Sequence, residues 1–231
     1  MRSVFRTDRV TGRLSVSLVA VVVLIVVSIV HPRNSHAADL AKPGEEIAAA
    51  VELVTRGQVQ DGYNSFLELA KAGNPHAMYH LGAINHSGIL GSEDLGKAVP
   101  WYQQAADAGV LEAQFALGSL YYKGKGVQKD LAKALNLFTA AADAGLLAAQ
   151  YNLAMMHTAG LAHTKDYNAD EDRPRAYKWF MVVLARLDPS VDRSPIDSAL
   201  ELLREEMTSI EVANGQKMAD AWLVANPGVK K

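Results

Sequence analysis

The chain has 231 residues, a formal net charge of −2 and no cysteine. This charge balance lacks the bulk basicity that is typical of nucleic-acid-binding proteins. Without cysteine the chain can form no disulfide, thiolate nucleophile or thiolate metal site, so packing must stabilise the fold.

The N-terminus has the layout of a secretory signal peptide over residues 1–37. Arginines up to Arg13 precede an uncharged stretch of apolar or small residues, 14–30, and small residues offer a cleavage site after Ala37. The alternative is an uncleaved anchor, because residues 14–30 lie at the lower edge of membrane-spanning length. Both interpretations predict a periplasmic location in a bacterium, with membrane contact only through this segment if it is uncleaved.

Cleavage after Ala37 would leave 18 basic and 24 acidic residues, which is a net charge of −6. An acidic mature chain argues further against nucleic acid or anionic lipid as the ligand. Residues 38–44 then form a linker. Apolar periodicity predicts two helices, 45–56 and 58–72, which we interpret as an N-terminal capping hairpin over residues 45–73.

Three copies of one segment follow at an offset of 36 residues, at 77–82, 113–118 and 149–154. Self-similarity at such a period indicates stacked helical hairpins, because a single hairpin cannot bury its apolar face alone. We place the hairpins at residues 74–109, 110–145 and 146–187. No segment has the alternation of a β-strand, so the predicted fold class is all-α.

Helix starts recur at equivalent places in the three copies. Asn74 before Pro75 is predicted to begin the first copy. Asp94, Asp130 and Asp172 occupy equivalent positions and are predicted to cap the second helix of each hairpin. We expect Pro100 to kink the helix after Asp94 or to delay its start, because proline has no N–H for the helical ladder.

The third copy and the C-terminus depart from the repeat. Six extra residues fall in an acidic turn, 161–173, and insertions in solenoids map to loops that often lie on a binding side. Two more helices within 194–227 are predicted to cap the array with a polar outer face. Ser194 is expected to cap the first, and Thr208 with Glu211 reads as a capping box for the second.

The second copy also resembles a known family. It shows the pattern A-x-x-x-L-G-x-x-Y-x-x-G-x-G-V-x-x-D-x-x-K-A, followed by an aromatic residue, two alanines and a glycine, at Ala113, Leu117, Gly118, Tyr121, Gly124, Gly126, Val127, Asp130, Lys133, Ala134, Phe138, Ala141, Ala142 and Gly145. This resembles the Sel1-like repeats, relatives of the tetratricopeptide repeat, and the resemblance covers about residues 57 to 185. It implies a right-handed α/α superhelical solenoid that binds other proteins; many bacterial members are exported.

A helical wheel places an aromatic residue of each copy opposite the core stripe, so the three form a ladder away from each hairpin's own core. This ladder is either part of a concave groove, since rigid aromatic side chains suit protein recognition, or packing between neighbouring repeats. The candidate partner-binding residues are Tyr79, Glu112, Phe115, Ser119, Tyr122, Lys123, Tyr151 and Met155.

Metal sites have weak support in the sequence. His76 and His80 have the i, i+4 spacing of zinc ligands, but no spacing fixes a third ligand. The stretch 166–172 opens like a calcium loop, yet Glu171 stands where the loop needs glycine and Tyr177 where it needs glutamate. We therefore predict no metal and no cofactor.

No segment carries a nucleophile, metal or phosphate-binding motif of an enzyme. We therefore expect a non-catalytic periplasmic adaptor or scaffold for an unidentified protein partner, such as a regulator of an envelope sensor or assembly. The alternative is a protein associated with peptidoglycan or another glycan. A hydrolytic form would need two carboxylates on one groove wall, and on the wheel only Glu112 faces the groove.

Overall fold

The computed structural model describes residues 44–162 and 169–227. These residues form ten helices and no strand, so the described part of the chain is all-α, as predicted. The chain divides into two compact units, described here over residues 44–146 and 147–227. None of the helices seen in these two ranges is long and apolar enough to cross a membrane. The predicted leader, 1–37, lies outside the described residues.

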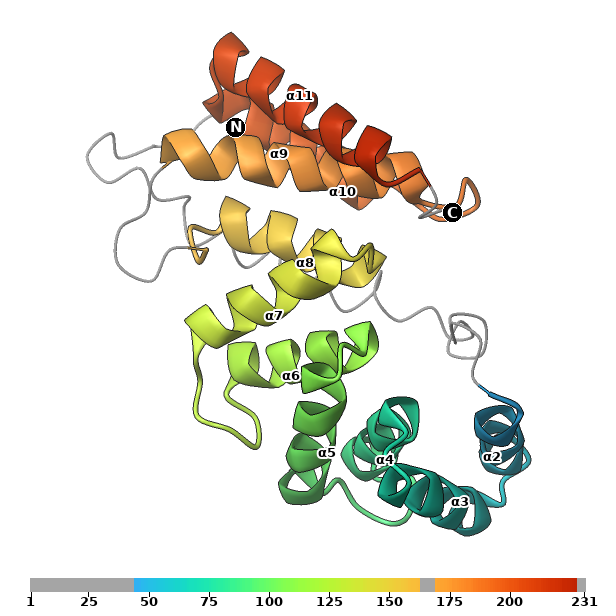
Figure 1. The fold of residues 1–231 in the computed structure, drawn as a ribbon. Coiled ribbons are helices and arrows are strands. Elements are labelled where there is room, and N and C mark those ends of the chain that lie inside the picture. The colour runs from blue at the N-terminus through green and yellow to red at the C-terminus, as the bar shows by residue number, and fades with distance from the viewer. Residues whose placement is uncertain (1–43, 163–168, 228–231) are drawn as a thin grey trace, which may run out of the picture. The chain divides into compact units, whose positions relative to one another are not determined.

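The first unit is a run of three helical hairpins (Figure 1). Its helices are α2 (Glu45–Thr55), α3 (Val59–Lys71), α4 (Pro75–Ser87), α5 (Leu95–Asp107), α6 (Leu111–Lys123) and α7 (Leu131–Asp143). Each helix packs on the next one in the chain, which is the arrangement of a helical solenoid. One buried cluster joins α2, α3 and α4 around Phe66 and Leu81. A second joins α5 and α6 around Tyr102 and Leu117.

Side-chain caps begin the repeat helices where the sequence predicts them. The Asn74 carboxamide oxygen accepts hydrogen bonds from the backbone N–H groups of His76 and Ala77, at 3.0 and 3.1 Å. Asp94 and Asp130 each accept one from the N–H three residues later, at 3.0 and 2.9 Å. These bonds satisfy N–H groups that have no partner within the helix, and they fix the register of the hairpins.

Glycine sets the distance between the two helices of a hairpin. A Cβ atom at Gly82 would lie 2.6 Å from Cδ1 of Tyr102, and one at Gly118 would lie 2.9 Å from Cε1 of Phe138. Real Cβ atoms are not found so close to ring carbons, so the ring of the second helix lies directly on the glycine of the first. In the third copy the equivalent position is Ala154, which is fully buried.

The expected delay at Pro100 is wrong. Helix α5 begins at Leu95, directly after its cap at Asp94, and continues through Pro100 to Asp107. Proline inside a helix costs about 3 kcal/mol or more. The buried positions Ala98 and Tyr102 on either side of Pro100 hold the helix against α4 and α6, and this packing outweighs the lost bond.

The second unit contains α8 (Leu147–Thr158), α9 (Ala169–Arg186), α10 (Ser194–Glu206) and α11 (Ser209–Ala225). Helix α9 packs against both α8 and α11. Trp179 of α9 meets Trp222 of α11 edge to face, with ring centroids 5.9 Å apart, and the Arg186 guanidinium lies 5.6 Å from the Trp222 ring. Gly215 of α11 lies on Tyr177, where a Cβ would approach Cδ1 to 2.9 Å.

The predicted cap at Asp172 is wrong. Helix α9 begins at Ala169, so Asp172 lies inside its first turn. The Asp172 carboxylate is fully buried, and its Oδ1 lies 2.7 Å from Nδ1 of His157 on α8. The acidic residues Asp170 and Glu171 favour a helix N-terminus, which moves the helix start one turn earlier than in the other copies.

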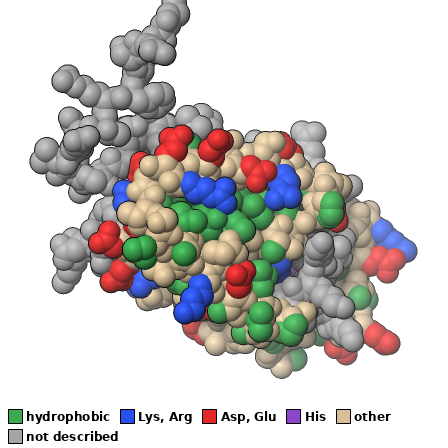
Figure 2. Space-filling view, turned by 90° about the horizontal axis from the view of Figure 1, so that it is seen from above, with side chains coloured by type: hydrophobic (Ala, Val, Ile, Leu, Met, Phe, Trp, Pro, Cys, Tyr) green, Lys and Arg blue, Asp and Glu red, His purple; other side chains and the backbone are tan. Residues whose placement is uncertain are grey.

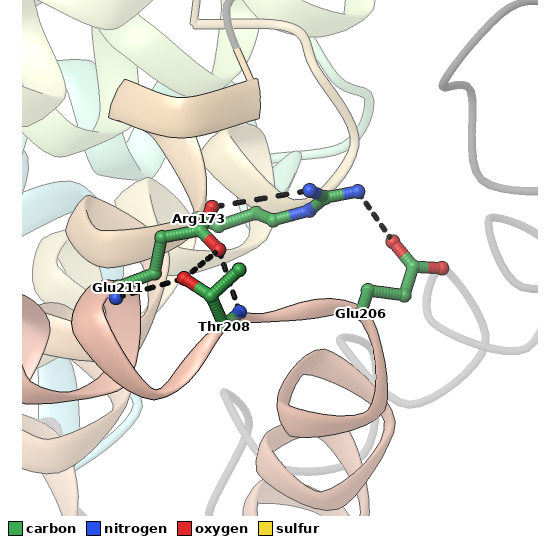
Figure 3. A network of polar contacts seen from close by, with 4 residues as sticks. All are labelled: Arg173, Glu206, Thr208 and Glu211. Atoms are coloured by element: carbon green, nitrogen blue, oxygen red, sulfur yellow. Dashed lines mark hydrogen bonds and ion pairs between the residues drawn. The ribbon is translucent and has the colours of Figure 1, made fainter.

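A polar network joins α9 to the C-terminal helices (Figure 3). Arg173 of α9 lies 3.3 Å from the Glu206 carboxylate at the end of α10 and 3.9 Å from that of Glu211 on α11. Glu211 also accepts from the backbone N–H of Thr208, whose hydroxyl oxygen accepts from the Glu211 N–H. The predicted capping box is therefore present. Ser194 is not a cap; it is the first residue of α10 and donates to Asp192.

The outer face of α11 is not uniformly polar, as a capping helix was expected to be. Ile210 is 71% exposed and Val224 is 80% exposed, and Met218 is also exposed. Figure 2, which views the molecule from above Figure 1, shows hydrophobic side chains interspersed with lysine, arginine and acidic side chains. The described residues of the second unit therefore end in a mixed surface.

Candidate protein-interaction face

Helix α6 carries a row of candidate residues along one side. Glu112, Phe115, Ser119 and Tyr122 follow each other at helical spacing and are all partly exposed, and Lys123 at the end of the helix is exposed. The opposite side of α6 is buried through Ala113, Leu117, Gly118 and Leu120. We call the row Glu112, Phe115, Ser119, Tyr122 and Lys123 the α6 face. Its side chains combine aromatic, hydroxyl and charged groups of both signs, which suits contact with a polypeptide.

Tyr79 of α4 lies close enough to the α6 face to be affected by the charge of Glu112. It packs on the core of α5 and α6, and its ring centroid lies 6.1 Å from that of Tyr102. Burial raises the pKa of Tyr79 to about 12, and the negative charge of Glu112 contributes to this rise. The Tyr79 hydroxyl is therefore a neutral hydrogen-bonding group at neutral pH.

The aromatic ladder is packed within the hairpins, which corrects the helical-wheel prediction. Phe115 meets Phe138 of α7 with ring centroids 5.6 Å apart, and Tyr151 meets Phe180 of α9 at 6.1 Å. Each ring thus contacts the aromatic residue of its own hairpin's second helix. The second helix approaches over Gly82 or Gly118, and this direction brings it close to the ring three residues earlier.

The remaining candidates differ in exposure. The Ser119 hydroxyl donates to the carbonyl oxygen of Phe115 at 2.9 Å, within its own helix. Burial raises the pKa of Tyr122. Tyr151 and Met155 lie in α8 of the second unit and are buried, at 5% and 9% exposure. The six candidates in the first unit therefore include the accessible ones, and the two in α8 have little surface for a partner.

Sequence reasoning missed a group of charged residues at one end of the first unit. His86 of α4 lies 3.3 Å from the Tyr102 hydroxyl and 3.6 Å from the Glu93 carboxylate. Burial lowers the pKa of His86, Glu93 opposes this, and Lys123 and Lys125 lower it further. The available signal was compositional, because residues 113–129 contain three lysines and no acidic residue.

His80, one of the two histidines with metal-ligand spacing, and the buried His157 contact aromatic and acidic side chains. His80 stacks on Phe66 with ring centroids 4.6 Å apart and an interplanar angle of 17°, so it belongs to the packing of α3 on α4. His157 pairs with Asp172. Within residues 44–162 and 169–227, no three His, Cys, Asp or Glu side chains gather as a metal site would require. Of the calcium-like stretch 166–172, residues 166–168 lie outside the described residues, and residues 169–172 form the first turn of α9.

Comparisons with known proteins agree with the repeat. The Sel1 repeat family model matches residues 75–110, 111–146 and 147–180. No curated protein matches the chain. Among solved structures, a protective antigen of uropathogenic Escherichia coli with an SLR fold is similar at 20% identity and a TM-score of 0.50. The similarity covers 78% of this chain and 45% of that protein, so the chain spans less than half of the relative's length. A Sel1 repeat protein from Oxalobacter formigenes is 26% identical, over 59% of this chain and 94% of that one, with a TM-score of 0.48.

Proposed function

Because the chain carries three Sel1 repeats, we propose that it is a non-catalytic protein-binding adaptor of the bacterial periplasm. Sel1 repeat proteins generally mediate protein–protein interactions and act as scaffolds. The observation that supports a binding role for this chain is the α6 face, where five residues at helical spacing remain accessible while the opposite side of the helix is buried. A rigid helix with such a row presents contact groups at fixed spacing, which lowers the entropy cost of binding.

The α6 face can be tested by placing an obstacle in its middle. Ser119 is partly exposed, and its hydroxyl bonds only to its own helix, so Ser119→Arg adds bulk at little cost in stability. The purified chain is used to capture proteins from an envelope extract. We expect the wild-type protein to retain a defined partner and the Ser119→Arg variant to retain at least about tenfold less, as for obstruction at the centre of an interface. Lys217→Glu, on α11 of the other unit, is the matched control and should retain the partner fully.

Two results would contradict this proposal. Retention of the same proteins in the same amounts by Ser119→Arg would exclude the α6 face. Binding of the chain to purified sacculi, with no protein retained from the extract, would favour the glycan-associated alternative.

The periplasmic location is tested separately, since residues 14–30 have the signal or anchor layout. A fusion of residues 1–60 to alkaline phosphatase should be active, because this enzyme folds to its active form only after export. An inactive fusion would place the protein in the cytoplasm.

A further inference from the structure

Two turns lie against each other at one end of the first unit. The turn between α4 and α5 covers residues 88–94, and the turn between α6 and α7 covers residues 124–130. Gly126 of the second turn lies on Leu95, the residue of α5 that directly follows the first turn, so closely that a Cβ at Gly126 would approach the Leu95 Cβ to 2.6 Å. The C-terminal ends of α4 and α6 therefore open onto one shared edge, which we call the turn edge.

The turn edge carries lysines that its own acidic residues do not compensate. Glu93 lies beside His86, Asp94 pairs with Lys97 at 3.0 Å and Asp130 lies 3.8 Å from Lys133. Asp94 and Asp130 are thus paired with lysines, whereas Glu93 keeps its charge, because the lowered pKa of His86 leaves the imidazole neutral at neutral pH. The edge therefore carries five lysines against three carboxylates. The other lysines of the edge are exposed and have no carboxylate within ion-pair distance among the described residues; they are Lys123, Lys125 and Lys129.

This positive edge belongs to an acidic body. Residues 44–146 contain seven lysines and arginines and eleven acidic residues, a net charge of −4. A partner with negative charge is therefore repelled by most of the unit and attracted to the turn edge, which gives both position and orientation to the encounter. At His86 on α4, burial lowers the pKa most, the negative charge of Glu93 raises it, and the positive charges of Lys123 and Lys125 lower it.

Exposed apolar side chains lie on the same edge. Ile89 is 54% exposed and Leu90 is 44% exposed, and both belong to the turn between α4 and α5. Large apolar side chains at the tip of a turn add area that a partner can cover. The edge therefore offers cations for carboxylates beside apolar groups for one or two hydrophobic side chains.

We propose that the turn edge binds a polypeptide segment of the protein partner that carries carboxylates beside a large apolar side chain, such as leucine. Carboxylates of the segment pair with Lys123, Lys125 and Lys129, and an apolar side chain covers Ile89 and Leu90. The proposal rests on the proposed adaptor function, and it specifies the chemistry of the partner. The turn edge adjoins the α6 face at Lys123, which belongs to both surfaces.

The test uses the full chain and a synthetic peptide of repeated Glu-Glu-Leu units with a fluorescent label, followed by anisotropy. We expect binding that weakens as salt is raised, because surface charge pairs are screened. The double variant Lys125→Glu, Lys129→Glu should weaken binding about tenfold, as for the loss of two surface charge pairs with repulsion added. Both lysines lie outside the helices, and unchanged circular dichroism and melting will show that the fold is intact.

Matched controls separate charge from apolar contact. Lys217→Glu changes an exposed lysine of α11 and should leave peptide binding unchanged. A peptide of Gln-Gln-Leu units should bind at least about tenfold more weakly than the Glu-Glu-Leu peptide. Ile89→Ser with Leu90→Ser should weaken binding of the acidic peptide without changing its salt dependence.

Three outcomes would overturn the proposal. These are equal binding by the charge-reversed variant, equal binding of the Gln-Gln-Leu peptide, or stronger binding of the chain to phosphatidylglycerol vesicles than to the acidic peptide. Capture from envelope extract distinguishes this failure from that of the adaptor function. If the extract yields a partner that Ser119→Arg loses but Lys125→Glu, Lys129→Glu retains, the adaptor function stands and the turn edge is excluded.

Discussion

The second and third copies of the repeat, α6–α7 and α8–α9, have the same pattern but use the same positions differently. Asp130 is a partly exposed helix cap that bonds a backbone N–H, whereas Asp172 at the equivalent position is buried and bonds His157. Phe115 is partly exposed on Phe138, whereas Tyr151 is buried on Phe180. The comparison teaches that a repeat motif specifies where a side chain is attached and leaves its environment to the neighbouring helices.

The largest expected effect is on the aromatic pairs. Tyr151→Ala should lower the free energy of unfolding by about 4 kcal/mol, because it opens a cavity at a buried ring, and Phe115→Ala by about 2 kcal/mol, because part of its ring already contacts solvent. Urea unfolding followed by circular dichroism measures both. Equal losses would mean that Phe115 contributes as much packing as a buried ring, and the α6 face would then have less accessible surface than we describe.

The acidic positions give the next difference. Asp172→Ala should cost about 3 kcal/mol, because it removes one member of a buried pair and leaves His157 without its carboxylate. Asp130→Ala should cost about 1 kcal/mol, as for other helix caps. The same unfolding experiment compares them. If Asp130→Ala proved at least as damaging as Asp172→Ala, the exposed cap would stabilise the fold as much as the buried pair, and the comparison would fail.

A smaller effect is expected at Gly118, the glycine of α6 in the second copy of the repeat. Gly118→Ala should lower the free energy of unfolding by about 1 kcal/mol, since the new Cβ would collide with the Phe138 ring, partly offset by the higher helix propensity of alanine. The thermal midpoint measures the change. Gly96→Ala in α5 is the control, because a Cβ there would meet only the end of the Asp94 side chain, at 3.3 Å, and no ring. An increase in stability for Gly118→Ala would show that the helices can separate freely.

The smallest effect is a change in titration. Burial raises the pKa of both Tyr79 and Tyr151, but only Tyr79 has a nearby charge, that of Glu112. Glu112→Gln should therefore lower the pKa of Tyr79, from about 12, and leave that of Tyr151 unchanged. Ultraviolet titration of tyrosinate, with Tyr151→Phe to assign the signal, measures this. A shift of Tyr151 alone would contradict the assignment.

The raised pKa of Tyr79 also predicts how stability depends on pH. Tyr79 contributes to the free energy of unfolding through this shift. The contribution is fully present below pH 10, the usual pKa of tyrosine, and is lost as the pH rises toward about 12. Tyr79→Phe should remove this part of the alkaline loss, which urea unfolding at a series of pH values will show. An unchanged alkaline loss would mean that other groups cause it.

The sequence predicted the repeat well because its strongest signals are local. The 36-residue offset, the cap at Asn74 and the caps at Asp94 and Asp130 depend on a few neighbouring residues, and all three caps are present. The prediction failed at Asp172, where the inserted turn allows an earlier helix start and a buried histidine offers a different partner. A cap is predictable only where the helix start is fixed.

The candidate site was harder to predict for a geometric reason. A helical wheel treats one helix at a time, so it placed Tyr79 and Phe115 away from the cores of their own hairpins. The position of Gly82 or Gly118 in fact determines where the second helix lies. Residues outside helices have no wheel position at all. The uncompensated lysines Lys125 and Lys129 were therefore missed, although the lack of acidic residues from 113 to 129 pointed to them.

Gly215 has a consequence for how such an array could evolve. Helix α11 lies on Tyr177 and on the carbonyl oxygen of Pro174 so closely that no side chain fits between them. A duplicated hairpin joined after α9 would have to displace this helix and its ionic contacts with Arg173. Growth of the array by tandem duplication is therefore easier between existing hairpins than at its C-terminal boundary.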